Sequence, residues 1–527
     1  MLLSLASAAL LAASASTAAA ADTILLTHNA RSPRYDPDPA VRFAWAQRQV
    51  LAGRAKYARF ASEGEQEVLR REMEERDDTE AFQRRAVGSA QINNWGRDTQ
   101  YTAKISVGTP AQQFDVVVDT GSGDLWLLTA CTNATECGGI PLYDTGKSSS
   151  FQKNGSTYSI QYGMGSSSGV WGSDTVTFAG ATRSEQLLGL VDKTDAWNNA
   201  GTDIAGLIGM GWTATGTGPV PFWENLAPTW SDKQFGIWLA RETQTLDAST
   251  PVGQPPQQLV DNGGSITLGG VDTSLFQGDL NYVSLPTGVQ EQTYWQVPLD
   301  GMVAFGQKIN TDASSGFLNT QESKSLAVID TGTTLMYVPT AIADQFWQSV
   351  PGAISYGGMN FYPCDTIPDF GLGFTFGGVT YYVSATDLVA STYSATDLEA
   401  ALGGRLGGNA KRWCQGSIVG QSSHEGTPPF LIGDAFIKNV YTAYRYDPPA
   451  IGFALLSSKA NNTFGANGAA NTGSGGGAAP TDSASSSSGS GSSSSGSGSG
   501  SSSAATKVQA CSALVLGAAL TALVSAL

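Results

Sequence analysis

The sequence predicts a mainly β protein, whose foldable part of about 370 residues is long enough for two packed lobes. This part is rich in Gly, Thr, Ser, Val and Tyr, and its apolar residues fall in many short alternating segments bounded by turn residues. Helical patterns are few, and short helices are predicted near residues 341–350 and 394–402. We place an N-terminal lobe at residues 86–276 and a C-terminal lobe at residues 277–458.

Two segments precede the lobes. Residues 1–21 are apolar and then small, which predicts a secretory signal peptide. Residues 22–85 hold equal numbers of acidic and basic side chains, so the net charge of −16 resides outside them. Because the first half of this segment is strongly basic, we interpret it as a propeptide that covers an acidic cleft at neutral pH and releases it when carboxylates protonate. Arg84 and Arg85 predict cleavage by a dibasic-specific protease.

One short pattern occurs twice in the foldable part. An apolar, β-branched run leads into Asp119-Thr120-Gly121-Ser122, and a similar run leads into Asp330-Thr331-Gly332-Thr333. A carboxylate at the end of a buried strand is costly unless it is hydrogen-bonded or shares a proton with a neighbour. The duplication therefore indicates that the two acids meet and work as a pair. A third Asp-Thr-Gly, at Asp144, lacks the apolar run and is predicted to be a solvent turn.

The duplicated loops resemble those of the pepsin-like aspartic peptidases, and the resemblance runs from about residue 95 to 456. It implies a bilobal fold with a central cleft covered by a β-hairpin flap. Further landmarks in family order are residues 101–126 around the first acid, two apolar-Gly segments at 204–211 and 430–436, the crossover between lobes at 268–272, and residues 294–297 at the start of the second lobe.

The resemblance also implies a role for each loop residue. Asp119 and Asp330 are the catalytic acids, with a water held between them. Four hydroxyl residues support the loops, by linking them or by bonding the carboxylates: Thr120, Ser122, Thr331 and Thr333. Gly121 and Gly332 allow the backbone to approach the acids and the substrate. Ordinary turn-stabilising hydroxyls are the alternative interpretation of the support residues.

Residues 158–176 alternate and contain several glycines, which predicts a hairpin with a mobile tip. In the family this hairpin is the flap that closes over the substrate. Tyr162 and Gly163 then contact substrate, and Trp126 is the indole partner of Tyr162. A packed aromatic pair without a catalytic role is the alternative.

The sequence lacks the residues that other classes of hydrolase need for catalysis. The chain has two histidines; His28 falls in the segment predicted to be removed, and His424 lies in a polar stretch typical of a loop. Serine, cysteine and zinc hydrolysis therefore lose their usual base or ligand. We predict no metal, no cofactor and no nucleic-acid partner, and we expect a monomer.

The five cysteines fit an oxidised extracellular protein. Spacing does not prove pairing, and buried free thiols are the alternative. The family resemblance favours bridges between Cys131 and Cys137 and between Cys364 and Cys414, with Cys511 left over. Acceptor sequons for N-glycosylation occur at Asn133, Asn154 and Asn461.

The C-terminus has two low-complexity parts. Residues 459–505 are largely Gly, Ser and Ala and predict an extended stalk. Residues 506–527 are mostly apolar and predict a GPI-anchor signal, with a tail-anchored transmembrane helix as the alternative. Signal, dibasic propeptide, lobes, stalk and anchor together resemble the yapsins, fungal GPI-anchored aspartic peptidases that cleave after basic residues. We therefore expect a cell-surface protein, and consider Asp124 a contributor to a preference for cationic substrates.

The sequence thus predicts a secreted or cell-surface aspartic endopeptidase that hydrolyses polypeptides at acidic pH. Lys56-Tyr57 resembles the inhibitory Lys-Tyr of the family, so Lys56 is predicted to lie against the two acids, with the propeptide as an intramolecular inhibitor. A basic face of an amphipathic helix is the alternative interpretation of Lys56. The alternatives are an inactive pepsin-like binding module and a structural cell-surface glycoprotein.

Overall fold

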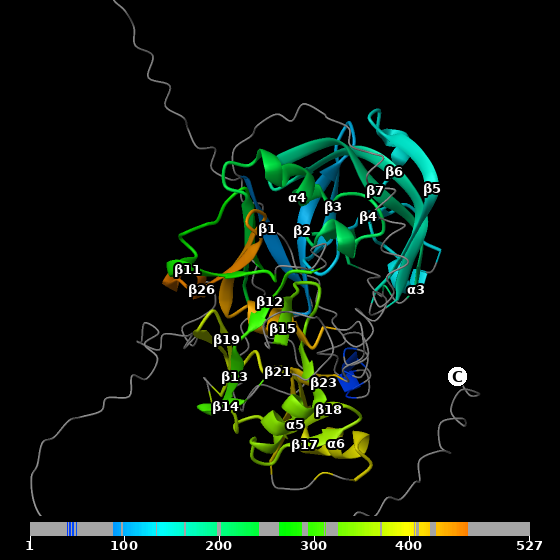
Figure 1. Ribbon diagram of the computed structural model, residues 1–527. Coiled ribbons are helices and arrows are strands. Elements are labelled where there is room, and N and C mark those ends of the chain that lie inside the picture. Colours follow the sequence, from blue (N-terminus) through cyan, green and yellow to red (C-terminus); the bar gives the residue numbers. More distant parts are fainter. Residues whose placement is uncertain are drawn as a thin grey trace, which may run out of the picture. The chain divides into compact units, whose positions relative to one another are not determined.

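The computed structural model describes residues 39, 42–43, 45–46 and 49 and, with gaps of which the longest are 242–262 and 312–324, residues 88–461. The predicted signal peptide, stalk and hydrophobic tail, and most of the predicted propeptide, lie outside the described residues. Strands dominate the described part, and they gather into several sheets (Figure 1). The prediction of a mainly β fold is therefore confirmed.

The largest sheet joins strands from both ends of the described chain. Strand β25, near the C-terminal end, pairs with β9 (Thr442 opposite Ile237), so this sheet ties late residues to early ones. The strands lie in the order β11 (Phe276–Ser284), β26 (Ala450–Leu456), β25 (Val440–Arg445), β9 (Gln234–Leu239), β10 (Gly264–Leu268), β1 (Gly88–Trp95), β2 (Gln100–Val107), β3 (Gln112–Asp119), β8 (Ile204–Gly209), β4 (Leu125–Leu128), β7 (Ala181–Asp195), β6 (Ser166–Phe178) and β5 (Gln152–Gln161).

Three smaller sheets are built from the second half of the chain. The first contains β12 (Gln296–Leu299), β15 (Ser325–Ile329), β24 (Phe430–Ile432), β16 (Met336–Pro339) and β23 (Ile418–Gln421). The second contains β14 (Gln307–Ile309), β13 (Gly301–Ala304), β19 (Leu372–Phe376) and β20 (Val379–Val383). The third contains β17 (Ile354–Tyr356), β18 (Met359–Pro363), β22 (Arg412–Gly416) and β21 (Val389–Ser394).

The helices are short. They are α3 (Ala134–Cys137), α4 (Phe222–Leu226), α5 (Thr340–Gln348), α6 (Ala395–Ala401), α7 (Asp434–Ile437) and α8 (Ser458–Asn461). Both predicted helices are present as α5 and α6; α6 begins after Ser394, whose side chain caps it by accepting a hydrogen bond from the Asp397 amide at 3.0 Å. In the part of the chain that the structure describes, no helix has the length and apolarity needed to cross a membrane.

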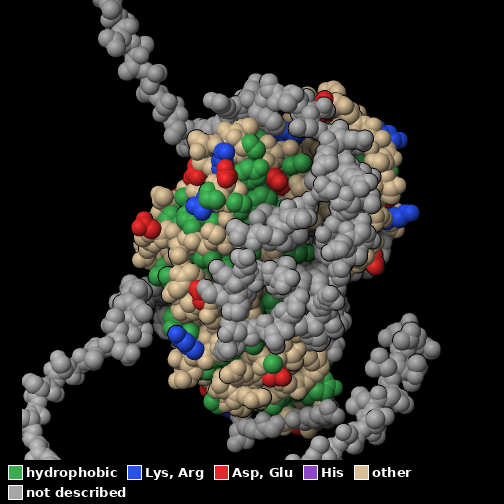
Figure 2. Space-filling view, in the orientation of Figure 1, with side chains coloured by type: hydrophobic (Ala, Val, Ile, Leu, Met, Phe, Trp, Pro, Cys, Tyr) green, Lys and Arg blue, Asp and Glu red, His purple; other side chains and the backbone are tan. Residues whose placement is uncertain are grey.

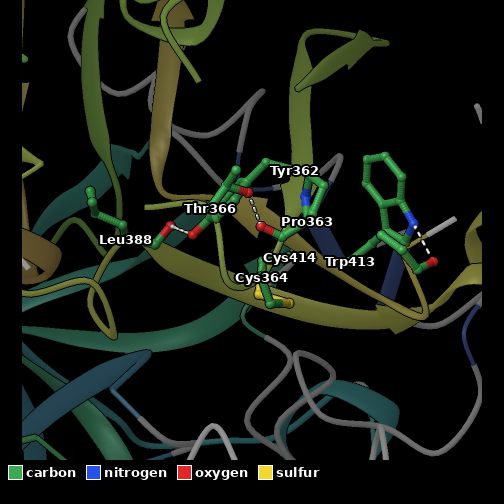
Figure 3. The surroundings of a disulfide bond; sticks show 8 residues. Tyr362, Pro363, Cys364, Thr366, Leu388, Trp413 and Cys414 are labelled. Carbon is green, nitrogen blue, oxygen red and sulfur yellow. Dashed lines mark hydrogen bonds between the residues drawn. A yellow bond between two sulfur atoms is a disulfide. The ribbon is translucent and has the colours of Figure 1, made fainter. Parts of the chain in front are cut away.

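Two disulfides tie neighbouring segments. Cys131 and Cys137 close a short loop at α3. Cys364 and Cys414 link the end of β18 to β22, where Tyr362 lies opposite Cys414 (Figure 3). Both bridges that the family resemblance favoured are present.

Candidate active site

The first Asp-Thr-Gly loop follows β3 directly. Residues 116–118 are buried because β3 lies inside the sheet, parallel to β8 on one side. Asp119 ends the strand and is 1 % exposed. Its Oδ1 accepts a hydrogen bond from the Gly121 amide at 2.8 Å, and its Oδ2 accepts one from the Ser122 hydroxyl at 2.6 Å. The loop thus holds both oxygens of its own acid.

The second loop repeats this arrangement after β15. Asp330 is 0 % exposed. Its Oδ1 accepts a hydrogen bond from the Gly332 amide at 2.9 Å, and its Oδ2 accepts one from the Thr333 hydroxyl at 2.5 Å. In both loops the same carboxylate oxygens accept hydrogen bonds from the same backbone and side-chain positions. Ser122 and Thr333 therefore occupy equivalent positions.

Two threonines join the loops to each other. The Thr120 amide donates to Thr331 Oγ1 at 3.1 Å, and the Thr331 amide donates to Thr120 Oγ1 at 3.0 Å. Each hydroxyl then donates onward across the junction, Thr120 to the Ile329 carbonyl at 3.0 Å and Thr331 to the Val118 carbonyl at 2.7 Å. All four bonds are buried, where an unpaired amide or hydroxyl would be costly. The aspartate that precedes each threonine is therefore carried to a common junction.

A second segment supports each loop from behind. In the first half, the Met210 amide donates to the Asp119 carbonyl at 2.7 Å and the Gly211 amide to the Ser122 carbonyl at 2.8 Å. In the second half, the Asp330 amide donates to the Ile432 carbonyl at 3.0 Å and the Asp434 amide to the Thr333 carbonyl at 2.8 Å. The two apolar-Gly segments, residues 204–211 and 430–436, therefore run beside the catalytic loops.

Glycine is required in these supporting segments for a steric reason. A Cβ at Gly209 would lie 2.4 Å from the Gly123 carbonyl carbon, and a Cβ at Gly433 would lie 2.0 Å from the Thr333 carbonyl oxygen. Because these neighbouring atoms belong to the backbone, they cannot rotate away from an added Cβ as a flexible side chain could. These glycines let the supporting strands come close enough to bond the loops.

The predicted flap is the hairpin of β5 and β6. The Tyr162 amide donates to the Gly165 carbonyl at 2.9 Å and closes the turn. The Trp126 indole donates to the Tyr162 hydroxyl at 2.7 Å, so this partner lies where the resemblance implied. Trp197 packs edge-on against Trp126, with ring centroids 4.7 Å apart; nothing in its polar surroundings along the chain marked it beforehand. Gly163, at the tip, lies outside the described residues.

A buried charge cluster lies elsewhere in the fold, and the sequence did not reveal it. Lys438 Nζ lies 2.7 Å from Asp98 Oδ2 and 2.9 Å from Asp387 Oδ1. Arg241 Nη2 lies 2.9 Å from Asp387 Oδ2. Burial alone would raise the pKa of Asp387, but the charges of Arg241 and Lys438 outweigh it and hold that pKa at about 2. We call Asp98, Arg241, Asp387 and Lys438 the charge cluster.

Asp124 is not available to a substrate cation, so the expectation that it biases the cleft is wrong. It is 0 % exposed, and its two oxygens accept hydrogen bonds from the amide and hydroxyl of Thr217, at 2.9 and 2.6 Å. Among the described side chains visible in Figure 2, acidic ones are interspersed with basic and uncharged ones and form no continuous patch. By contrast, the prediction for Asp144 is confirmed, because it lies in an exposed turn and caps it by accepting from the Gly146 amide at 3.0 Å.

The remaining candidate residues are distributed as follows. Asn154 is exposed, and its Oδ1 accepts a hydrogen bond from the Ser156 hydroxyl at 2.6 Å. Asn461 is the last residue of α8. Residues Asn133, Lys56, Arg84 and Arg85 lie outside the described part of the chain. Within the described ranges, no three His, Cys, Asp or Glu side chains gather in a way that could hold a metal ion.

Comparisons with known proteins agree with this geometry. A family model described as eukaryotic aspartyl protease matches residues 100–456. The chain is 35% identical over 438 residues to major aspartyl peptidase 1 of Cryptococcus neoformans var. grubii, covering 81% of this chain and 83% of that protein. Pepsin A of Sus scrofa is 28% identical, covering 70% of this chain and 84% of pepsin A. Cathepsin D of Chionodraco hamatus is also 28% identical, covering 68% of this chain and 81% of cathepsin D.

The chain therefore belongs to the eukaryotic aspartyl protease family. It is a pepsin-like aspartic endopeptidase, a hydrolase that acts on peptide bonds, and the prediction of an enzyme of this class is confirmed.

Proposed function

We propose that the enzyme hydrolyses polypeptides at acidic pH through one water activated between Asp119 and Asp330. The observation that carries this proposal is the reciprocal bonding of Thr120 and Thr331, which joins the two acid-bearing loops at one buried junction. Two carboxyls brought close together by this junction would not both ionise cheaply, so they would share one proton, as in pepsin, the established example of such a pair. The pair then supplies a base and an acid at the same time.

The proposed reaction uses each acid in turn. The charged carboxylate takes a proton from the water as the water oxygen adds to the scissile carbonyl carbon. The protonated carboxyl donates to the developing oxyanion, and a proton then passes to the amide nitrogen as the carbon–nitrogen bond breaks. No bond forms between enzyme and substrate. Since amides and hydroxyls of its own loop hold each acid, the two groups need little rearrangement during these steps.

An extended peptide is the substrate form that this proposal implies. Pairing of strand-like backbone with the flap and the two loops would position the scissile bond, and Tyr162, held by Trp126, would close over it. The substrate's own chain supplies the remaining donors and acceptors.

We further propose that the enzyme is made as a secreted zymogen and is carried to the cell surface by a GPI anchor. The apolar N-terminus, the basic half of residues 22–85, Arg84-Arg85 and the apolar tail support this layout. Strand β1 begins at Gly88, so cleavage after Arg85 would leave the sheet intact.

Proteolysis by the processed enzyme tests the proposal. The full chain, cut after Arg85, should cleave an unfolded protein substrate at acidic pH, and pepstatin should block the cleavage. Activity that is insensitive to pepstatin and greatest at neutral pH would overturn the shared-proton mechanism. Release of the cell-bound enzyme by a phospholipase specific for GPI anchors tests the location; retention of the protein after that treatment would contradict the anchor.

A further inference from the structure

A short helical piece of the predicted propeptide lies against the second half of the chain. Its described residues, all helical, include Arg42, Phe43, Trp45, Ala46 and Gln49. Arg42, Trp45, Ala46 and Gln49 follow the spacing of one helix face, and each is at most 9% exposed. We call the described residues 39, 42, 43, 45, 46 and 49 the docked segment; they are drawn in dark blue near β23 in Figure 1.

The surface below the docked segment is one face of the β17-β18-β22-β21 sheet. Phe361 and Trp413 lie on this face and share a hydrophobic cluster with Trp45 and Ala46. Their chain neighbours Tyr362 and Cys414 belong to the main core on the opposite face, as the alternation of strand side chains requires. The sheet therefore has two apolar faces, and Trp45 and Ala46 contribute to the packing of this one.

Aromatic stacking defines the position of the docked segment. Phe43 stacks on Phe361 with ring centroids 6.1 Å apart and an interplanar angle of 4°. Phe43 also contacts Tyr356, at 6.3 Å between centroids. At the other end of the segment, the Tyr337 hydroxyl donates to the Gln49 carbonyl. The contacts extend over seven residues and are made to three strands.

Charge adds a specific contact. Arg42 is 1% exposed; its Nη2 lies 3.5 Å from Asp397 Oδ2, and its guanidinium lies 5.3 Å from the centre of the Tyr393 ring. Asp397 lies in the first turn of α6, a helix fixed in place by its Ser394 cap. A buried guanidinium that loses its carboxylate is strongly destabilised, so this pair distinguishes the docked segment from another apolar helix.

We propose that this face is a docking groove for a short helix with Arg, Phe and Trp at positions i, i+1 and i+3, and that it holds the docked segment after the chain is cut. These contacts involve neither catalytic acid. The inference rests on the proposed propeptide role of residues 22–85. Its consequence is that, at neutral pH, cleavage behind Arg85 alone leaves the groove occupied, so that cutting the chain and releasing the docked segment are separate steps.

The test uses the full chain with Asp119→Asn, which prevents self-digestion, and with a specific endoprotease recognition sequence in place of residues 79–85. After cleavage at neutral pH, gel filtration should show the N-terminal fragment eluting with the lobes. A second protein with the recognition sequence at residues 51–55 separates the docked segment from Lys56. Its N-terminal fragment should also remain bound, because the groove and not Lys56 holds it.

Matched variants test the contacts. Trp45→Ala and Asp397→Asn should each weaken fragment binding by about tenfold or more. Glu399→Gln changes an exposed acid two positions along α6 and should leave binding unaltered. The lobes of each variant should melt at the unsubstituted temperature once the fragment is gone. A fragment that separates from the unsubstituted lobes, or that is retained equally by Asp397→Asn and Glu399→Gln, would overturn the proposal. Neither result depends on catalysis, so failure here is distinguishable from failure of the proposed activity.

Discussion

Two groups of buried acidic side chains, those of the catalytic loops and those of the charge cluster, are held by different kinds of partner. In the catalytic loops, amides and hydroxyls of the same loop hold Asp119 and Asp330. In the charge cluster, Lys438 and Arg241 hold Asp98 and Asp387. Cationic partners hold the pKa of Asp387 low by their charge, whereas the donors in the catalytic loops carry no formal charge and fix the position of each carboxylate by hydrogen bonds alone. Burial alone therefore does not identify a catalytic acid, and neutral partners alone do not either, because the amide and hydroxyl of Thr217 hold the buried Asp124. What distinguishes Asp119 and Asp330 is that their two loops are joined to each other.

The largest expected effect comes from removing either catalytic charge. Asp119→Asn and Asp330→Asn should each lower kcat/KM by about 10⁴-fold or more, because the remaining acid cannot act as both base and donor. Steady-state kinetics on the processed enzyme measures this loss. Asp144→Asn, in the exposed third Asp-Thr-Gly, is the matched control and should leave kcat/KM unchanged. Equal losses of kcat/KM in all three variants would contradict the assignment of Asp119 and Asp330, and not Asp144, as the catalytic acids.

The next effect falls on stability and not on chemistry. Asp387→Asn leaves Arg241 and Lys438 without a shared carboxylate, which should lower the free energy of unfolding by about 3–5 kcal/mol. Denaturant unfolding of the inactive Asp119→Asn protein measures it without self-digestion. Asp447→Asn is the control, because its pair with Lys233 is exposed and 3.8 Å long, and it should cost less than about 1 kcal/mol.

The same variant has a distinct pH signature. The pKa of Asp387 is about 2 in the fold and 3.8 is its ordinary value, so its contribution is complete above pH 4 and is lost as the pH falls from about 4 to about 2. This contribution is roughly 2 kcal/mol. Stability of the Asp387→Asn protein should therefore fall less steeply over that interval. An unchanged slope would show that Asp387 does not keep its charge through the cluster.

A third effect tests the junction between the loops. Thr331→Val keeps the shape of the side chain but removes a hydroxyl that accepts from the Thr120 amide and donates to the Val118 carbonyl. It should lower stability by about 2–4 kcal/mol and reduce kcat. Thr331→Ser keeps both bonds and should retain most of each property. If the two variants behave alike, the hydroxyl is not what joins the loops.

The smallest effect concerns the flap. Tyr162→Phe removes the oxygen that accepts from the Trp126 indole. The loss of one hydrogen bond of this kind should lower kcat/KM by about tenfold, with melting temperature nearly unchanged. Kinetics with a short and a long peptide measures the effect. Full activity in this variant would leave the pair as aromatic packing only.

The catalytic loops could be predicted because their sequence pattern occurs twice in the chain. A buried strand, an acid and a hydroxyl at fixed offsets form a local pattern, and the two copies led to the pairing of the loops. The charge cluster has no such pattern: Asp98 and Lys438 are separated by 340 positions, and no repeated motif surrounds either residue. Asp124 shows the opposite failure, because its partner Thr217 lies 93 positions away and turns an apparent surface charge into a buried structural group.

The dependence of kcat/KM on pH tests the central claim most directly. If Asp119 and Asp330 share one proton, kcat/KM of the processed enzyme should pass through a maximum at acidic pH and fall on both sides, as the pair gains a second proton or loses its only one. A single rising limb that levels off near neutral pH would mean that one group with a higher pKa does the work, and it would contradict the account.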